Sequence, residues 1–213
     1  MLIHQTSDFW SEFAQKENLN EEQLKKYISY YELLIEWNSR INLTAITKQE
    51  EVIAYHFQDS IRLGDIVDLN ENICIADVGS GAGFPSLPLK IRYPHLAVVL
   101  IEVNLKRVRF LQEVIKKLDL DTVQISTLDW RTFLRQTHYP IDFFCARASL
   151  SIPELLHMCK PSCPYRQAGI VYWASDKWMA AKNVEKIIKK EYLYKVGTKK
   201  RKLVVFSCIE CII

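Results

Sequence analysis

The sequence predicts an α/β fold: a doubly wound, mainly parallel sheet with helices on both faces, preceded by an N-terminal helical extension. Residues 73–88, ICIADVGSGAGFPSLP, have the pattern of a buried strand, a glycine loop and the start of a helix. Strand-like apolar runs and helical stretches then alternate along the chain, which indicates parallel strands joined by helices. The first 70 residues contain helical patterns only. We therefore expect a helical extension at 1–70 and an α/β domain at 71–213.

Two capping pairs mark helix starts in the extension. Asn20 with Gln23, and Thr47 with Glu50, have the spacing at which the two side chains cap each other's backbone. Apolar residues at helical spacing follow both pairs. We expect a helix after each of them.

Beyond the glycine loop, units of strand and helix repeat. Apolar runs predict strands at 97–101, 122–127, 141–146, 168–174 and 203–209. Helical spacing and capping signals predict helices over 108–118, 129–135 and 177–190, and one more that is capped by Ser151 and Glu154. These helices would cover the two faces of the sheet.

The composition is that of an ordinary globular protein. Of the 213 residues, 49% are apolar and 25% are charged. No apolar run approaches the roughly 20 residues that span a bilayer. The N-terminus lacks the layout of a signal peptide, so we expect a cytoplasmic protein with no membrane segment. The formal net charge is only +3, but basic residues gather at 106–109 and in the C-terminal part.

The cysteines are most simply interpreted as reduced thiols. They occupy positions 74, 145, 159, 163, 208 and 211. The alternative is a zinc site made from the four at 159, 163, 208 and 211. The two pairs differ in spacing and the second is at the C-terminus, so reduced thiols without a metal are favoured.

The glycine loop has the layout D-x-G-x-G-x-G, from Asp77 through Gly79, Gly81 and Gly83. In a parallel sheet such a loop lies at the carboxyl edge of a strand, where glycines let a ligand approach the backbone. A dinucleotide site expects G-x-G-x-x-G, but Phe84 holds the third glycine position. Glycines alone also fit a tight turn of any α/β protein, so the interpretation depends on what accompanies them.

Glu102 accompanies the loop, at the end of the next predicted strand and 19 residues after Gly83. A carboxylate accepts hydrogen bonds without donating them, so Glu102 is placed to receive the two ribose hydroxyls of an adenosine. If Glu102 stood alone, it would more simply be explained as a solvent-exposed residue at the end of a strand. Because the glycine loop accompanies it, we favour the ligand-binding role.

Several motifs together resemble the RsmG (GidB) family, which methylates N7 of a guanine in bacterial small-subunit (16S) ribosomal RNA. They are DVGSGAGFPSLPL with IE at the next strand end, NLTAI (42–46), HFQDS (56–60), KRVRFL (106–111), RAS (147–149) and KLVVF (202–206). The resemblance implies a Rossmann-like class I methyltransferase fold and S-adenosyl-L-methionine as the cofactor.

The resemblance also implies a set of cofactor-binding residues. They are Asp77, Gly79, Gly81, Gly83, Phe84, Glu102, Asp129, Trp130, Arg131 and Arg147, with Arg147 at the border of the methyl-transfer pocket. Near the adenine the family usually has a small residue followed by Glu, so here the backbone of Trp130 and the carboxylate of Asp129 would serve. An alternative role for Trp130 is to stack on the adenine. At the end of the fifth strand the family usually has Lys-Gly, whereas this chain has Ser175, Asp176 and Lys177.

Guanine N7 carries a lone pair and no proton, so no general base is expected and Arg147 is interpreted as a positioning residue. The predicted RNA-binding residues are Asn42, His56, Lys106, Arg107 and Arg109. For His56, together with Asp59, a structural hydrogen bond is an equally good interpretation. The C-terminal lysines are a weaker case, because a charged helix face is common.

The expected partner is small-subunit ribosomal RNA or the small ribosomal subunit, bound by a monomer. One alternative is a non-catalytic RNA-binding relative, motivated by the departures at Trp130-Arg131 and Ser175-Asp176. Another is a nicotinamide-dependent oxidoreductase, against which Phe84 argues.

Overall fold

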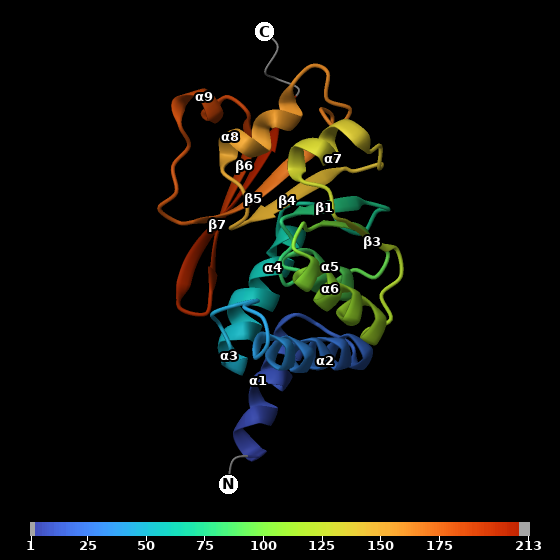
Figure 1. The fold of residues 1–213 in the computed structure, drawn as a ribbon. Helices are drawn as coiled ribbons and strands as arrows, with labels where there is room; N and C mark the ends of the chain where they lie inside the picture. The colour runs from blue at the N-terminus through green and yellow to red at the C-terminus, as the bar shows by residue number, and fades with distance from the viewer. Residues whose placement is uncertain (1–2, 209–213) are drawn as a thin grey trace.

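The computed structural model describes residues 3–208, which fold around a seven-stranded sheet (Figure 1). The strands are β1 (Cys74–Val78), β2 (Ala97–Ile101), β3 (Val123–Ser126), β4 (Phe143–Arg147), β5 (Gly169–Ser175), β6 (Ile188–Val196) and β7 (Lys199–Ser207). Their order is β3-β2-β1-β4-β5-β7-β6. β1 to β5 pair in parallel, whereas β7 runs antiparallel to both of its neighbours. The predicted doubly wound, mainly parallel sheet is confirmed.

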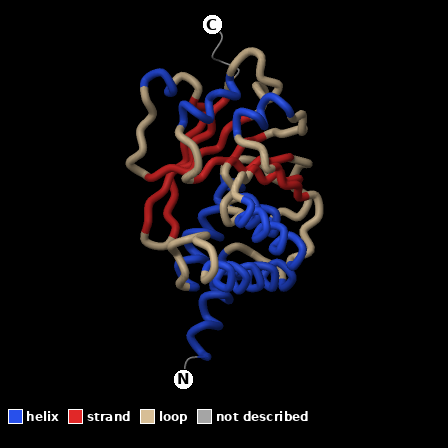
Figure 2. The backbone as a smooth tube through the Cα atoms, in the orientation of Figure 1, coloured by secondary structure: helices blue, strands red, loops and turns tan. Residues whose placement is uncertain are grey.

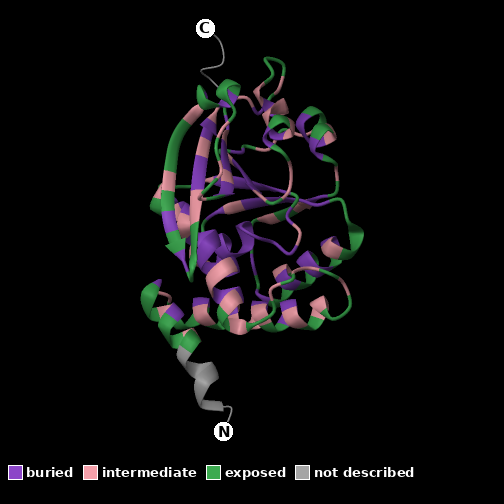
Figure 3. Cartoon of the chain, turned by 90° about the vertical axis from the view of Figure 1, so that its left-hand side faces the viewer, coloured by how far each residue is buried: buried purple, intermediate pink, exposed green. Residues whose placement is uncertain are grey.

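The helices lie in two layers, one on each face of the sheet (Figures 1 and 2). One layer contains α1 (Ile3–Lys16), α2 (Glu21–Asn38), α3 (Gln49–Val52), the π-helix η1 (Ile53–Gln58), α4 (Asp59–Ile61), the 3-10 helix η2 (Arg62–Asp65), α5 (Ser86–Arg92) and α6 (Leu105–Lys117). The other contains α7 (Trp130–Gln136), α8 (Ile152–Leu155), the 3-10 helix η3 (Leu156–Cys159) and α9 (Lys182–Glu185). Each layer packs on the sheet through its own hydrophobic core, and buried positions concentrate in the central strands (Figure 3). Between residues 3 and 208 no helix is long and apolar enough to cross a membrane.

The N-terminal helices share the core of the first layer with the sheet. The capping box at Asn20 is confirmed, because its side chain accepts from the Gln23 N–H at 2.8 Å and the Gln23 side chain accepts from the Asn20 N–H at 3.1 Å. The pair at Thr47 and Glu50 does not cap a helix. Instead α3 begins after Lys48, which makes no side-chain cap, and its chain continues directly into the π-helix η1.

The helix predicted at 177–190 is wrong. Only the single turn of α9 is helical there, and β6 begins at Ile188. Towards the end of β6, Tyr194 and Val196 are buried while Lys195 between them is exposed, which is the two-residue period of a strand. β6 and β7 form a hairpin, and β7 begins at Lys199 rather than at the predicted position 203. Of the C-terminal lysines, Lys182 lies on the single turn of α9, whereas those from 189 to 202 lie on the β-hairpin and not on a helix face.

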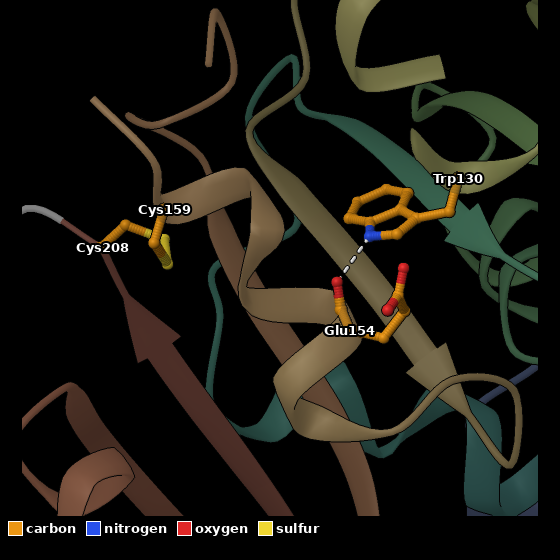
Figure 4. Close-up of a disulfide and its surroundings, with 4 residues drawn as sticks. All are labelled: Trp130, Glu154, Cys159 and Cys208. Carbon is orange, nitrogen blue, oxygen red and sulfur yellow. Dashed lines mark hydrogen bonds between the residues drawn. A yellow bond between two sulfur atoms is a disulfide. The ribbon is translucent and has the colours of Figure 1, made fainter. Parts of the chain in front are cut away.

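The prediction that all cysteines are reduced thiols is also wrong. Cys159, at the end of η3, forms a disulfide with Cys208, just after β7 (Figure 4). Their Cα atoms lie 4.9 Å apart although 49 positions separate them, a proximity that sequence spacing does not show. Cys74, Cys145 and Cys163 are free thiols. Cys211, which the zinc alternative also needs, lies outside the described residues.

Candidate active site

The glycine loop lies where the strand order reverses. β1 pairs with β2 on one side and with β4 on the other, so the segments that follow β1 and β4 meet at one carboxyl edge. Doubly wound sheets bind their ligands at this point. Gly79, Gly81 and Gly83 have φ angles of +69°, +59° and +87°, a region that favours glycine.

Gly81 and Gly83 have different surroundings. A methyl group at Gly83 would lie 2.6 Å from the side chains of Leu87 and Tyr30, whereas one at Gly81 would meet nothing closer than 3.8 Å. The Tyr30 hydroxyl donates to the Ala82 carbonyl at 2.5 Å, which fixes the loop on α2. Gly83 therefore allows close packing, and Gly81 leaves its backbone open to a ligand.

Glu102 directly follows β2, and only 4% of its surface is exposed. Its Oε2 accepts from the Gly81 N–H and its Oε1 from the Asn104 N–H, both at 2.8 Å. Asn104 caps α6, so the carboxylate links the glycine loop to the start of that helix. Each carboxylate oxygen has a further lone pair, and two ribose hydroxyls need two such acceptors.

Asp77 lies beneath the loop with 1% of its surface exposed. Its Oδ2 accepts from the Ser86 N–H at 3.2 Å, and its Oδ1 has no hydrogen-bond partner within residues 3–208. Burial raises the pKa of Asp77 to about 7, against the lowering effect of the hydrogen bonds from Ser86. Asp77 thus ties β1 to the start of α5, and its direct contact with a cofactor stays a prediction.

Phe84 is packed between an aromatic cluster and a cation. Its ring centroid lies 4.4 Å from that of His56, with the planes at 14°, and 5.5 Å from that of Tyr30. The guanidinium carbon of Arg147 lies 5.3 Å from the same centroid. Phe84 is 7% exposed, so most of its surface contacts protein, and its contact with the cofactor also stays a prediction.

His56 makes structural hydrogen bonds with both ring nitrogens. Its Nδ1 accepts from Arg147 Nη2 at 2.9 Å, and its Nε2 lies 2.8 Å from Thr44 Oγ1. Since Nδ1 is the acceptor, the neutral ring carries its proton on Nε2 and donates it to Thr44. Burial and then the charge of Arg147 lower the pKa of His56 to about 3. The partners are thus Thr44 and Arg147 rather than Asp59, and neither nitrogen is left for the predicted RNA contact.

Arg147, the last residue of β4, is held in place by α4 and η1. Its Nη1 donates to Asp59 Oδ2 at 2.9 Å and to the Tyr55 carbonyl at 3.1 Å. Asp59 is fully buried, and its Oδ1 accepts from the Tyr194 hydroxyl of β6 at 2.7 Å. The predicted positioning residue is therefore itself positioned by a buried carboxylate.

The π-helix η1 explains how Arg147 reaches a backbone carbonyl. The Asp59 N–H bonds to the carbonyls of Ala54 and His56 and passes over Tyr55, its α-helical partner. Arg147 takes the carbonyl that is left. π-helical turns occur often at functional sites. Tyr55 and Tyr194 were missing from the sequence prediction, because nothing local signals a π-turn or a contact with the missed strand β6.

The segment after β3 is built differently from its prediction. The Trp130 indole is 6% exposed, packs edge-on against Phe144 at 5.1 Å and donates to the Glu154 carbonyl at 2.9 Å (Figure 4). The indole is thus part of the core, and its stacking on the adenine stays a prediction. Arg131 forms two bonds to the Glu154 carboxylate, at 2.7 and 2.9 Å. Asp129 caps α7 by accepting from the Thr132 N–H. Cofactor binding by these three residues stays a prediction.

Three of the predicted RNA-binding residues come together. Asn42, Lys106 and Arg107 line an open cavity of about 340 Å³, which Arg40, Ile41 and Asn104 complete. Arg107 Nη1 also lies 3.8 Å from Glu102, so this cavity adjoins the glycine-loop site. Arg109 is exposed further along α6. Arg40 was missed, although it lies only two residues before Asn42, the first residue of the NLTAI motif.

The residues present fit S-adenosyl-L-methionine. The open space beside Gly81 leaves room for a ligand, and polar groups at this strand edge come from the two carboxylate oxygens of Glu102 and from Asp77 Oδ1, which has no hydrogen-bond partner within residues 3–208. Val103, which follows Glu102, is 58% exposed and offers an apolar surface for an adenine base. Val103 was not predicted, because the sequence does not show that the side chain of this single apolar residue is exposed.

Solved structures share this fold at low sequence identity. A human methyltransferase 10 domain containing protein has a TM-score of 0.55 at 13% identity, covering 70% of this chain and 82% of its own. TrmK of M. capricolum, solved with S-adenosyl-homocysteine, has a TM-score of 0.53 at 14% identity, covering 70% and 67%. These matches show the Rossmann-like fold of class I methyltransferases, and the site residues described above fit the cofactor S-adenosyl-L-methionine.

Sequence comparison then identifies the family. Residues 23–204 match the profile of GidB, rRNA small subunit methyltransferase G, and the chain belongs to this family. A relative from Aster yellows witches'-broom phytoplasma, named ribosomal RNA small subunit methyltransferase G, is 35% identical over 90% of both chains. Relatives of the same name from Bacillus subtilis and Bacillus cytotoxicus are 39% and 41% identical over 72% and 68% of this chain, which spans 66% and 61% of their lengths.

Proposed function

We propose that the protein transfers a methyl group from S-adenosyl-L-methionine to N7 of a guanine in 16S ribosomal RNA. The observation that carries this proposal is the junction of the glycine loop with Glu102, beside an Arg147 that faces the same strand edge. Membership of the rRNA small subunit methyltransferase G family supports RNA as the substrate and argues against the nicotinamide alternative.

The cofactor would supply an electrophilic methyl group on a sulfonium. Guanine N7 would donate its lone pair to that methyl carbon while the carbon–sulfur bond breaks and its electrons return to sulfur. No proton leaves N7, so the protein needs no general base there. The rate enhancement would come from holding the two reacting atoms in line.

The chain's own residues suit this positioning task. Glu102 would hold the ribose, and the backbone at Gly79 and Gly81 would line the rest of the cofactor. Arg147 is fixed by Asp59 and His56 before any substrate arrives, so it would lose little conformational freedom on binding. A fixed cation at this edge would orient the guanine without taking part in proton transfer.

The RNA would approach across the cavity lined by Asn42, Lys106 and Arg107, with Arg109 further along the same helix. Phosphate contacts of this kind fix the register of a nucleic acid without specifying its sequence. We propose a cytoplasmic monomer that acts on the small ribosomal subunit or on its RNA, with residues 1–70 as a helical extension of the methyltransferase domain.

Methyl transfer from labelled cofactor tests the proposal. Purified small subunits and naked 16S RNA from cells that lack the enzyme are incubated with the protein and tritiated S-adenosyl-L-methionine. We expect label in RNA from at least one of these substrates. If neither is labelled although the protein binds both S-adenosylhomocysteine and RNA, the non-catalytic relative is correct and the proposal fails.

A further inference from the structure

The β6–β7 hairpin extends past the active-site edge of the sheet. β7 pairs with β5 from Ser207 only as far as Arg201, opposite Ser175 at the carboxyl end of β5. Lys199 and Lys200 continue beyond that end, paired only with β6. Since β5 is parallel to β4, this is the edge at which Arg147 and the glycine loop lie. The tip of the hairpin therefore extends beyond the same edge of the sheet at which the proposed site lies.

The tip is attached to the residue whose carbonyl holds Arg147. The Tyr55 hydroxyl lies 3.0 Å from Thr198 Oγ1 in the turn, and Lys199 Nζ lies 4.1 Å from the centroid of the Tyr55 ring. Figure 1 shows the hairpin reaching towards α3, which leads into η1. Tyr55 thus touches the hairpin with its ring and Arg147 with its backbone.

The cations of the tip are poorly compensated. Lys195 and Lys200 are exposed and directly opposite each other across the two strands, an arrangement of like charges that destabilises a strand pair. Within residues 3–208, the ion pairs of this hairpin join Lys202 to Glu191 and Arg201 to Asp59, and none involves Lys195 or Lys200. Two acids, at positions 12 and 50, share a cavity of about 420 Å³ with Lys195 but form no ion pair with it in the described chain.

Arg201 is the link between the tip and the site. Its Nε lies 3.6 Å from Asp59 Oδ1 and is buried without a hydrogen-bond partner among the described residues. Its side chain is still 29% exposed. Burial and Arg147 are the larger causes that lower the pKa of His56 to about 3, and the charges of Arg201 and Lys199 add to them. The hairpin cations are therefore close enough to act on the site.

We propose that the hairpin tip, through Lys195, Lys199, Lys200 and Arg201, binds the phosphodiester backbone of the RNA next to the target guanine. A polyanion at this position would relieve the repulsion between the opposed lysines and accept hydrogen bonds from the exposed part of the Arg201 side chain. The proposal rests on RNA being the substrate. The competing explanation is that lysines on an edge strand only prevent pairing with another sheet.

The test compares two double variants with the same loss of charge. Lys195→Gln/Lys200→Gln removes two cations from the hairpin and leaves the contacts of Tyr55 intact. Lys116→Gln/Lys117→Gln removes two exposed cations from the last turn of α6, away from the site edge. Binding of fluorescently labelled 16S RNA is measured by anisotropy between 50 and 300 mM KCl, and S-adenosylhomocysteine binding is measured by calorimetry.

The hairpin variant should bind RNA about tenfold more weakly at 150 mM salt, with a salt slope smaller by about 1.4, as expected for two lost contacts to single-stranded phosphates. The control variant should keep both quantities, and both variants should bind S-adenosylhomocysteine as the wild type does. Lys195→Arg/Lys200→Arg should restore RNA binding. Equal RNA affinity in the two glutamine variants overturns the proposal, and increased self-association of the hairpin variant would then support the edge-protection explanation. Failure of the wild type to bind RNA or cofactor would instead overturn the proposed function.

Discussion

His56 is kept neutral by its partners as well as by its burial. The Arg147 N–H that points at Nδ1 leaves no room for a proton there. The pKa of His56 is lowered to about 3, so between pH 3 and the ordinary value of 6.5 the unfolded chain binds one more proton than the folded chain. The contribution of His56 to the free energy of unfolding is therefore fully present above pH 6.5 and is lost as the pH falls below 6.5.

Replacing His56 by Gln should remove this dependence. Between pH 7.5 and 5.5, the wild type should lose about 1.4 kcal/mol of unfolding free energy relative to His56→Gln. Asp77, whose pKa is raised to about 7, acts in the opposite direction in both proteins and cancels in the comparison. Urea unfolding at the two pH values measures the difference. A constant difference between wild type and variant would contradict the neutral, hydrogen-bonded histidine.

Glu102 is the residue on which cofactor affinity should depend most. Glu102→Gln keeps the size of the side chain but places an amide N–H₂ where an acceptor is needed, so a buried charged hydrogen bond worth about 1.5–3 kcal/mol is lost. Calorimetry should show S-adenosylhomocysteine binding weakened roughly 10- to 150-fold. Glu113→Gln, an exposed position on α6, is the matched control and should bind normally. Equal affinities in the two variants would remove Glu102 from the site.

At the scale of single elements, substitutions at two glycines of the loop measure the cost of backbone strain separately from the cost of a steric clash. Gly81→Ala meets open space, so it should cost only the strain of a positive φ, about 1–2 kcal/mol. Gly83→Ala has the same kind of strain and also collides with Leu87 and Tyr30, which should add about 1–3 kcal/mol. Urea unfolding followed by tryptophan fluorescence measures both. A Gly81 variant at least as unstable as the Gly83 variant would show that the loop is packed differently.

The elements that sequence could predict are those whose signal is local. β1 and β2 are short apolar runs with clear ends, and the capping box at Asn20 is complete within four residues. β6 could not be predicted, because its lysine-rich sequence suits an exposed helix as well as an edge strand. Pairing with β7 and packing of Tyr194 and Val196 into the core beneath the first helical layer decide between the two.

At the scale of the whole molecule, the contacts of the site that are local in sequence could be predicted, and those between distant segments could not. The glycine loop and Glu102 are 21 residues apart at their hydrogen bond and share a motif, so their meeting was predictable. Arg147 meets Asp59 and His56 across 88 and 91 residues, and Asp59 meets Tyr194 across 135. Such contacts depend on the packing of the first helical layer against the sheet, which no local pattern records.

The packing of the first helical layer against the sheet also determines whether residues 71–213, the predicted α/β domain, can fold without residues 1–70. Tyr30 and Phe57 pack into one cluster with Phe84, and Asp59 holds Arg147. A fragment of residues 71–213 would lack Tyr30 and Phe57, expose Phe84 and leave Arg147 without the carboxylate of Asp59. We expect it to lack a cooperative urea transition and to bind the dye ANS, whereas the full chain unfolds cooperatively. Cooperative unfolding of the fragment would show that residues 1–70 are dispensable for the core.

The central claim is that this site delivers a methyl group to N7 of a guanine, and the modified atom can be measured directly. A guanine methylated at N7 is cleaved from RNA by borohydride reduction followed by aniline, and primer extension locates the break. Small subunits from cells that lack the enzyme, treated with the protein and S-adenosyl-L-methionine, should acquire one new break at a guanine of 16S RNA. Incorporation of labelled methyl groups without any such break would place the modification on another atom and contradict the account.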